Sequence, residues 1–580
     1  MKERVRAYAT LCFFLIVSLL SSAFAEEPAT DLSLYQPAEE KNQINKIHIE
    51  AYDCFDPRIP QYRSWPFRFL NKMHNRTNDS FIQNALLVRE GDFIDQDILE
   101  ETERALRRYS FLGDVKIRQE KIGARKVDLY VHTEDQWTTQ IDISAGKSAG
   151  FSTFQVSLEE SNFLGMGKKI GFEYDRNPER TTQDFLYYDP QFLNSRWNFE
   201  VGYRTASDGW RYTTDLVRPF YSLDTKWAYG IAWDSGTFTK KLHYKGQTVA
   251  EIDTDHRTGL FFLARSWGNR YDKKRFGVLV AADSLLYPHP ARIILPEIAE
   301  VKPIQSNLHP INREDYQYGA ILQFDRQHFI EENYIDNFGR VEDYPSGLLL
   351  ASTLTHSDDQ EPNPDFYQLN SLALFTRQLS PSQYLALQSQ FSLRRHTDGD
   401  FSNAIFSGYA HYYLQMATFH VGPIRLPRQT VAVNFSTVLT NNVDAPFQIS
   451  LGEDEGLRGY TFKSFTGQNK ILMNLENRIF TPWNYRLLGF GLVGFLDAGY
   501  VWSGDENLQF SNFPVSVGIG LRIGLKKAQS ARVVRVDLAF PLRKDTSPFA
   551  TTDQKGYSIS ISSGQIFSVI ENIPKLFQLF

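Results

Sequence analysis

An arginine and two carboxylates in the last third of the chain have the residue types of a buried ion-pair cluster. Arg458 lies in the glycine-rich segment Gly452–Tyr460, and Glu476 and Asp497 follow in two apolar segments. The planar guanidinium group of an arginine can donate to two carboxylates at once. These three side chains can therefore hold a loop in a fixed position.

Alternation of residue types places both carboxylates on one side of two neighbouring strands. The residues that alternate with them are apolar: Met473, Leu475 and Ile479 in the first segment, and Leu492, Leu496 and Ala498 in the second. If the apolar residues face lipid, Glu476 and Asp497 face the lumen of a barrel. A lone Arg458 in that lumen would be costly unless it were paired with them, and its removal would leave both acids unneutralised. Gly456 and Gly459 would allow the tight turn. The alternative is that Arg458 is a solvated residue of an extracellular loop.

Other clusters that suggest an enzyme lack the residues that the chemistry requires. Gly518–Arg522 is no dinucleotide-binding motif, because it lies in an alternating segment that no helix follows. Asp253 and Asp255 lack the remaining ligands of a calcium loop. The sequence has no nucleophile elbow, no zinc-type pair of histidines and no phosphate loop. We therefore expect no catalytic residue, metal site or cofactor, and no enzymatic activity. His48 and His74 are expected to be structural or surface residues.

The composition favours a β-protein of an unusual kind. Hydrophobic residues make up 42% of the 580 residues and aromatic residues 14%, yet the mean hydropathy is −0.37. Such values result when apolar and polar residues alternate, and they exclude a polytopic helical membrane protein. The net charge of −6 gives no electrostatic reason to bind nucleic acid.

Residues 1–25 have the pattern of a secretory signal peptide. Basic residues precede the short apolar core Leu11–Leu20, and the small residues Ala23 and Ala25 follow it. The core is shorter than the roughly 20 residues that span a bilayer, although a tethering membrane helix is the alternative. Removal of residues 1–25 would leave Cys54 as the only cysteine of the sequence, which excludes an intramolecular disulfide. Residues 26–44 are expected to be a linker.

Residues 45–137 are predicted to form a small α/β domain. A strand around Ile47–Ile49 precedes two short helices, the second capped by Asp95. Two alternating segments at 115–117 and 127–131 then predict two further strands, separated by a turn around Gly123. The expected order is strand, helix, helix, strand, strand.

Residues 138–567 are predicted to form a transmembrane antiparallel β-barrel. Segments of about ten residues alternate between apolar and polar side chains, which is typical of barrel strands. One example is 227–234, in which aromatic and apolar residues alternate with small or polar ones. At about 28 residues per strand and loop, the region holds about 16 strands, although 14 or 18 also fit. The tail, residues 568–580, has no assigned role.

The N-terminal domain resembles a POTRA (polypeptide-transport-associated) domain. The resemblance rests on residues 70–77, on Leu86–Asp92 with its Glu-Gly-Asp turn, and on Glu103–Leu112. In that family an exposed edge of a three-stranded sheet is thought to accept client peptides as an added strand. A generic α/β domain is the alternative.

The barrel resembles the BamA-type outer-membrane insertase superfamily, also called the bacterial surface antigen family. Its hallmark is an arginine-glycine-aromatic loop tip that folds into the barrel and contacts acidic residues on nearby strands. Leu457-Arg458-Gly459-Tyr460, preceded by Gly456, fits the tip, and Glu476 and Asp497 fit the acids. Residues 160–167 and 518–522 resemble the family's first hairpin and its glycine-rich penultimate region. The chain departs from the best-known insertase in having room for only one transport module.

The resemblance implies a barrel in the outer membrane of a Gram-negative-type bacterium, with its N-terminal domain in the periplasm. Its expected function is to assist the insertion or translocation of unfolded polypeptide clients, with the lipid bilayer and accessory assembly subunits as partners. Two alternatives stay open: a dedicated exporter of one secreted partner, and a passive pore or structural barrel. Fold alone does not decide between them.

Overall fold

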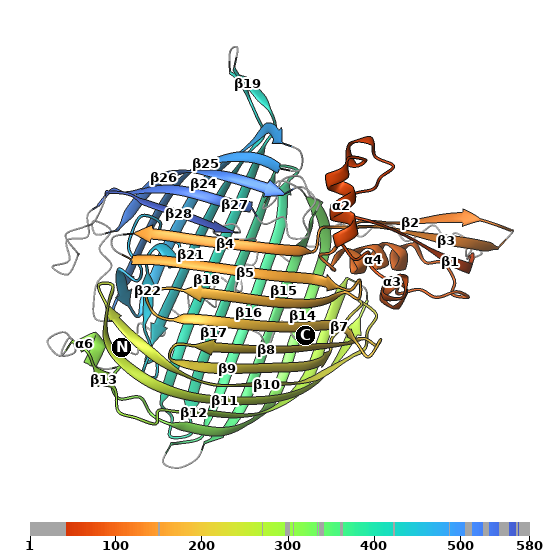
Figure 1. Cartoon of the computed structure of the whole chain (residues 1–580). Coiled ribbons are helices and arrows are strands. Elements are labelled where there is room, and N and C mark those ends of the chain that lie inside the picture. The colour runs from red at the N-terminus through yellow and green to blue at the C-terminus, as the bar shows by residue number, and fades with distance from the viewer. Residues whose placement is uncertain are drawn as a thin grey trace.

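The structure is a computed structural model that describes residues 42–567, except for 124, 149–150, 270, 296–301, 306, 333–334, 336–341, 360–362, 422–423, 486–487, 505–512, 526–532, 544–555 and 564–566. The predicted signal peptide (1–25), nearly all of the predicted linker (26–44) and the tail (568–580) lie outside the described residues. Two parts are evident in Figure 1, a small α/β domain and a large barrel.

The α/β domain, which we call the module, is built on a three-stranded sheet. Its elements are, in chain order, β1 (Gln43–Tyr52), the 3-10 helix η1 (Pro60–Tyr62), α2 (Trp65–Met73), α3 (Asp79–Ala85), α4 (Gln96–Arg107), β2 (Leu112–Lys121) and β3 (Lys126–Asp135). The sheet has the order β1-β3-β2, with β1 parallel and β2 antiparallel to the central β3. As expected, the Asp95 side chain caps α4 by accepting from the backbone N–H of Asp97. Helix α2 and η1, inserted between β1 and α3, have no counterpart in the predicted order.

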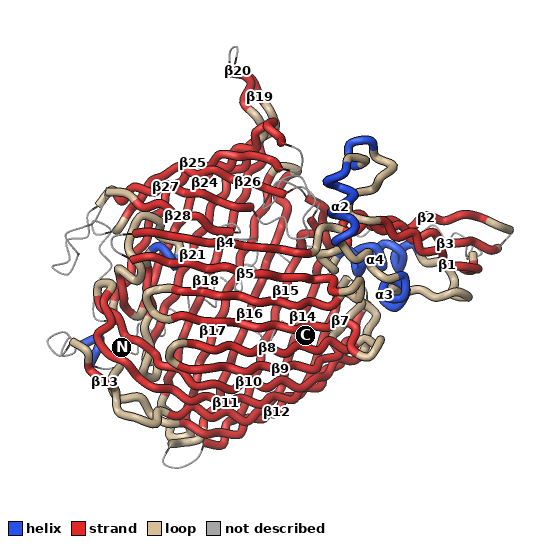
Figure 2. The backbone as a smooth tube through the Cα atoms, viewed as in Figure 1, coloured by secondary structure: helices blue, strands red, loops and turns tan. Residues whose placement is uncertain are grey.

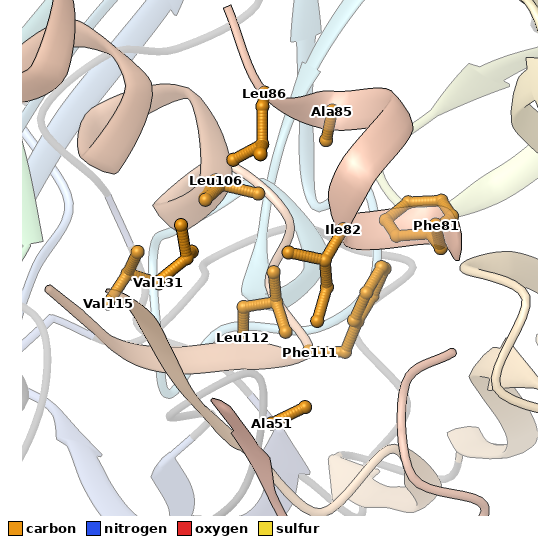
Figure 3. Packing of buried hydrophobic residues seen from close by; sticks show 10 residues of the cluster. All are labelled: Ala51, Phe81, Ile82, Ala85, Leu86, Leu106, Phe111, Leu112, Val115 and Val131. Atoms are coloured by element: carbon orange, nitrogen blue, oxygen red, sulfur yellow. The ribbon is translucent and has the colours of Figure 1, made fainter. Parts of the chain in front are cut away.

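The module core lies between the sheet and helices α3 and α4. Figure 3 shows ten buried residues that fill it: Ala51, Phe81, Ile82, Ala85, Leu86, Leu106, Phe111, Leu112, Val115 and Val131. They come from β1, α3, α4 and the two strands that follow, apart from Leu86 directly after α3 and Phe111 directly before β2, so that one apolar cluster joins every layer. This packing fixes the positions of α3 and α4, which carry some of the contacts to the barrel.

Twenty strands of the described residues close into an antiparallel barrel (Figures 1 and 2). They are β4 (Thr139–Ser148), β5 (Phe151–Phe163), β6 (Lys168–Arg176), β7 (Thr181–Phe192), β8 (Trp197–Ala206), β9 (Gly209–Arg218), β10 (Trp227–Tyr244), β11 (Gln247–Gly268), β12 (Asp272–Leu286), β14 (Arg313–Glu332), β15 (Glu342–Asp359), β16 (Phe366–Ser380), β17 (Gln383–His396), β18 (Phe401–Met416), β21 (Gln429–Asn441), β24 (Asn469–Tyr485), β25 (Leu488–Trp502), β26 (Val515–Leu525), β27 (Val533–Pro541) and β28 (Ser558–Ser563).

Short elements lie in the connections between these strands. They are β13 (Arg292–Ile293), which pairs with β11, the helix α6 (Lys302–Gln305), the hairpin of β19 (Phe419–Val421) and β20 (Ile424–Leu426), and the hairpin of β22 (Ile449–Leu451) and β23 (Phe465–Gly467) with the 3-10 helix η2 (Glu453–Glu455) between them. No helix of the described residues is long and apolar enough to cross a membrane.

The prediction of about 16 strands is wrong, because the connections are shorter than it assumed. Strands β10 and β11, for example, are joined by Lys245 and Gly246 alone, which both have positive φ as a two-residue hairpin turn requires. Ser207 and Asp208 likewise join β8 to β9. With shorter connections, each strand and its loop need fewer than the assumed 28 or so residues, so more strands fit in the region.

The predicted alternation is visible in the burial of the strands. In β10, Trp227, Ile231 and Trp233 are exposed on the outer face, whereas Ala228 and Gly230 are buried on the inner face. In a membrane barrel the outer apolar side chains face lipid.

The barrel closes where β28 pairs with β4, and the pairing between the described residues of this seam is short. The two strands pair at three register positions, Ile559 with Lys147, Ser560 with Gly146 and Ile561 with Ala145. By contrast, β4 pairs with β5 at ten positions. The last described strand, β28, covers Ser558–Ser563 of the segment predicted to extend to Phe567, and residues 564–566 lie outside the described residues.

The module is docked against the connections at one end of the barrel, which we call the module end. Asn162, near the end of β5, donates to the Thr77 hydroxyl over 2.8 Å. Arg196, between β7 and β8, donates to the backbone carbonyls of Ala85 and Leu86 at 3.2 and 2.7 Å. Farther round the barrel, α4 adds a 3.0 Å ion pair between Arg107 and Glu331 of β14. Several strands thus hold the module at one end of the lumen.

Candidate functional site

The structure brings Arg458 together with both acids inside the barrel. Arg458 donates through Nε and Nη2 to the two oxygens of Asp497, at 2.7 and 2.8 Å, and through Nη1 to Glu476 at 2.9 Å. Its guanidinium carbon lies 3.5 Å from the ring centre of Phe495. Arg458 is 2% exposed, and neither acid is exposed at all. Both acids alternate with outward-facing apolar residues in β24 and β25, as the alternation of residue types in the sequence predicted.

A second set of charges surrounds this cluster. Arg478 donates to the other oxygen of Glu476 at 2.9 Å, and Arg522 of β26 lies 3.6 Å from the same carboxylate. Arg522 also donates to Asp537 of β27, and Asp537 lies 3.5 Å from Arg458. The arginine of the loop thus joins an ion-pair network that spans four consecutive strands, β24 to β27.

This network changes the expected effect of losing Arg458. Glu476 would keep Arg478 and Arg522, so it would stay neutralised. Among the described residues, Asp497 would keep only the neutral amide of Asn474, which donates to it at 2.7 Å. The expectation that both acids would be left unneutralised is therefore wrong, because the sequence did not show that Arg478 and Arg522 point toward Glu476. Asp497 alone depends on the loop for a counter-charge.

The residues on either side of Arg458 fit the loop tip closely against the wall. Gly456 and Gly459 have φ of 95° and 89°, a left-handed conformation that favours glycine. A Cβ on Gly459 would lie 3.3 Å from the backbone nitrogen of Pro541. Leu457 is fully buried, and the Tyr460 hydroxyl donates to the carbonyl of Val515 at 3.0 Å. All seven predicted site residues lie in this one region of the lumen.

The same loop is attached to the opposite wall of the barrel. Lys463 forms an ion pair with Glu179, which lies between β6 and β7, and its carbonyl accepts from the backbone N–H of Gly246 at 3.1 Å. Gln448 exchanges two hydrogen bonds with the backbone of His243, at 2.7 and 2.8 Å. Gly246 and His243 belong to the β10–β11 hairpin, ten strands away from β25 around the barrel. The loop therefore crosses the lumen and is fixed on both sides.

Phe567, the last described residue, also lies in the lumen. Phe567 is 3% exposed and packs against Tyr344, Tyr384 and Tyr413, from β15, β17 and β18. The guanidinium of Arg478 lies 5.0 Å from the Phe567 ring centre, within cation–π distance. Phe567 and the network around Arg458 thus share one arginine.

The sequence interpretation missed Asp537, Arg522, Arg478 and Asn474 as parts of the site. The signal that could have found them is parity in the last strands: Asp537 and Arg522 lie opposite the apolar residues of β27 and β26. The alternation that placed Glu476 and Asp497 inward also places Arg522 and Asp537 in the lumen when it is applied to β26 and β27.

A further buried network joins the module to the barrel. The Asp135 carboxylate accepts from the backbone N–H and the hydroxyl of Thr77, at 2.7 and 2.8 Å, and Thr77 is in turn bound by Asn162. Burial raises the pKa of Asp135 to about 6 in spite of these bonds. His74 is buried 3.7 Å from Asp135. Within the described part of the chain, no group of His, Cys, Asp and Glu residues has the arrangement of a metal site.

Residues 380–567 match the Omp85 superfamily domain, which confirms the resemblance to the BamA-type superfamily. Among solved structures, the chain is similar to that of BamA from Haemophilus ducreyi lacking POTRA domains 1-3, with 14% identity, 90% of this chain and 85% of that chain covered, and a TM-score of 0.41. It is also similar to CdiB from Acinetobacter baumannii, with 11% identity, coverage of 90% and 74%, and a TM-score of 0.43. For CdiB from Escherichia coli the values are 10%, 90% and 77%, and 0.43.

Proposed function

We propose that this Omp85-type outer-membrane barrel assists the insertion or translocation of polypeptides at the outer membrane. The observation that carries the proposal is the loop held across the lumen, with Arg458 fixed by Glu476 and Asp497. A passive pore needs an open lumen, whereas this loop is attached to both walls and Phe567 packs inside. The lumen is therefore built to hold a defined internal structure.

The module, in this proposal, is a periplasmic POTRA-like domain that captures unfolded clients. Its strand β2 pairs with β3 on one side, and no other strand of the described residues pairs with it on the other. Arg118, Gln119, Glu120 and Lys121 of β2 are exposed. An unpaired edge of this kind can accept an extended peptide through backbone hydrogen bonds.

The seam between β28 and β4 is the place where a captured strand would enter the barrel wall. Among the described residues three register positions pair there, so few of the described backbone pairings must break for the strands to part. The free edges could then template a client strand or admit it to the lipid. This work is assembly, and we expect no bond-making chemistry.

Two other functions are separated from this one by the identity of the client. A dedicated exporter would handle one secreted partner, and a pore would handle no polypeptide. In intact cells, a photoreactive residue placed at Lys121 should capture clients, and the same residue at Glu100, exposed on α4, is the matched control. Several barrel proteins captured at Lys121 alone would support insertion. One secreted protein would support the exporter, and equal capture at both sites or none would contradict the proposal.

Proline substitutions test whether the edge of β2 itself holds the client. Proline has no N–H to donate, and the N–H groups of consecutive residues in a strand point to opposite sides. One of Arg118→Pro and Gln119→Pro should therefore lower capture at Lys121 more than the other, while heat-modifiable gel mobility shows an intact barrel. Unchanged capture with both variants would mean that the module is only a spacer.

A further inference from the structure

Helix α2 carries an exposed apolar stripe that is not part of the module core. Trp65, Phe69 and Met73 are spaced at i, i+4 and i+8, so they lie on one face of the helix. They are 71%, 54% and 60% exposed. Three large apolar side chains aligned in water indicate a surface that is covered by something else.

The opposite face of α2 fixes the helix rigidly to the module. Phe67 and Leu70 pack on a cluster of Cys54, Phe55, Tyr62 and Trp137. The Asn71 side chain exchanges two hydrogen bonds with the backbone of Phe55, at 2.7 and 3.2 Å. The stripe is therefore exposed because the helix is held in this orientation by its other face.

The position of α2 relates the stripe to the membrane. Trp137, which packs on the same cluster as the helix, lies two residues before β4, whose outward residues Ile141 and Ile143 are 68% and 54% exposed. In Figure 1, α2 lies beside the end of the barrel at which β4 begins and runs across the direction of that strand. A helix at the rim that crosses the strand direction can lie in the plane of the membrane surface.

The charges of α2 identify the chemistry of what covers it. The helix contains Arg68 and Lys72 and no acidic residue, and both basic side chains are exposed. Within the described part of the chain neither of them has an ion-pair partner. Arg68 follows Trp65 by three residues and Lys72 follows Phe69 by three, so both basic side chains lie beside the stripe on the helix surface. Aromatic and apolar residues bordered by basic ones are typical of helices that lie in the interface of a bilayer with anionic lipids.

We propose that α2 is an interfacial helix whose Trp65, Phe69 and Met73 side chains insert into the bilayer leaflet at the module end of the barrel. The stripe would be buried about 5–10 Å into the boundary between headgroups and acyl chains. Arg68 and Lys72 would contact anionic headgroups. The helix thereby attaches the start of β4, and with it one strand of the seam, to the membrane surface. This inference does not depend on the proposed function.

The test uses the full-length protein in vesicles of phosphatidylethanolamine and phosphatidylglycerol, with an environment-sensitive fluorophore on a cysteine at Phe69→Cys. The control is Ile122→Cys, an equally apolar residue that is 50% exposed at the tip of the β2–β3 hairpin. Protein without an added cysteine gives the background from Cys54, which is fully buried. The probe at 69 should emit at shorter wavelength than the probe at 122 and be quenched by lipids that carry a nitroxide near the headgroup.

A second pair of variants checks the role of the charges. Arg68→Glu combined with Lys72→Glu should weaken the quenching at position 69 in anionic vesicles and change it little in phosphatidylcholine vesicles. The inference is overturned if aqueous iodide quenches the probes at 69 and 122 equally. It is also overturned if the probe at 69 becomes protected only when an unfolded polypeptide is added, or only as protein concentration rises. Those results would assign the stripe to a client or to a second copy of the chain.

Discussion

Replacing Arg458 with alanine should loosen the loop while leaving the barrel folded. The substitution removes two hydrogen bonds to Asp497 and one to Glu476. Glu476 keeps Arg478 at 2.9 Å, so the cost comes from Asp497, a fully buried carboxylate left with one neutral donor. Removing one partner of a buried pair typically costs about 3–5 kcal/mol, and less where water reaches the orphaned group.

The measurement is limited proteolysis of the loop at residues 452–467, with heat-modifiable gel mobility to show that the barrel is intact. Arg458→Ala should be cleaved in the loop and should lose client delivery, and Arg458→Lys should recover little, because an ammonium group cannot donate to Asp497 in the same two-pronged way. The reversed pair, Arg458→Asp with Asp497→Arg, should also recover little, because the new carboxylate would face Glu476 and Asp537.

A double substitution separates the orphaned charge from the lost contacts. Adding Asp497→Asn to Arg458→Ala removes the unpaired carboxylate and keeps an amide that Asn474 can bind, so most of the lost protease resistance should return. If the double variant is cleaved as readily as Arg458→Ala, the energetic reasoning is wrong. If Arg458→Ala alone is fully active and protease-resistant, the loop is not held by this network.

Three further predictions concern the module and the lumen. The folded-state pKa of Asp135, about 6, lies above its ordinary 3.8. Its ionisation should therefore lower the free energy of unfolding of the module by about 3 kcal/mol as pH rises from 4 to above 6. Pulse proteolysis in urea should show this fall in stability, and Asp135→Asn should remove it. Phe567→Ala should lower the temperature at which heat converts the barrel on gels, because it empties a buried site worth about 3–5 kcal/mol and exposes Arg478. Gly167→Ala should undock the module, because its Cβ would lie 2.2 Å from the Phe81 ring, and hydrogen exchange in α3 should rise.

Each of these predictions has its own control or contradicting result. A flat stability profile between pH 4 and 6 in the unmodified protein would refute the Asp135 argument. An unchanged conversion temperature for Phe567→Ala would show that the residue adds nothing to the lumen. Gly171→Ala is the matched control for docking, since its Cβ would lie 3.6 Å from its nearest neighbour, an ordinary contact. Equal exchange in both glycine variants would contradict close packing as the cause.

The sequence could predict the parts of the fold and site that depend on local alternation. Parity alone placed Glu476 and Asp497 on the inner face, because successive side chains in a strand must point to opposite sides. The N-cap of α4 was predictable for a similarly local reason, since Asp95 satisfies an N–H two residues away.

Features that depend on distant parts of the chain were not predictable in this way. The number of strands depends on the lengths of the connections, which alternation does not define. The position of Phe567 depends on a pocket made by β15, β17 and β18, far from it in sequence. Helix α2 was missed because its nine residues include Pro66 and divide their apolar side chains between two faces, one on the module and one exposed.

The most direct test of the proposed function is a disulfide across the seam, between cysteines at Gly146 and Ser560, which are register partners. If clients pass through the seam, the oxidised protein should no longer deliver them to the outer membrane of intact cells, and reduction should restore delivery. A disulfide between Gly259 and Ala282, register partners in β11 and β12, should have no effect. Undiminished delivery by the oxidised seam variant would contradict the account.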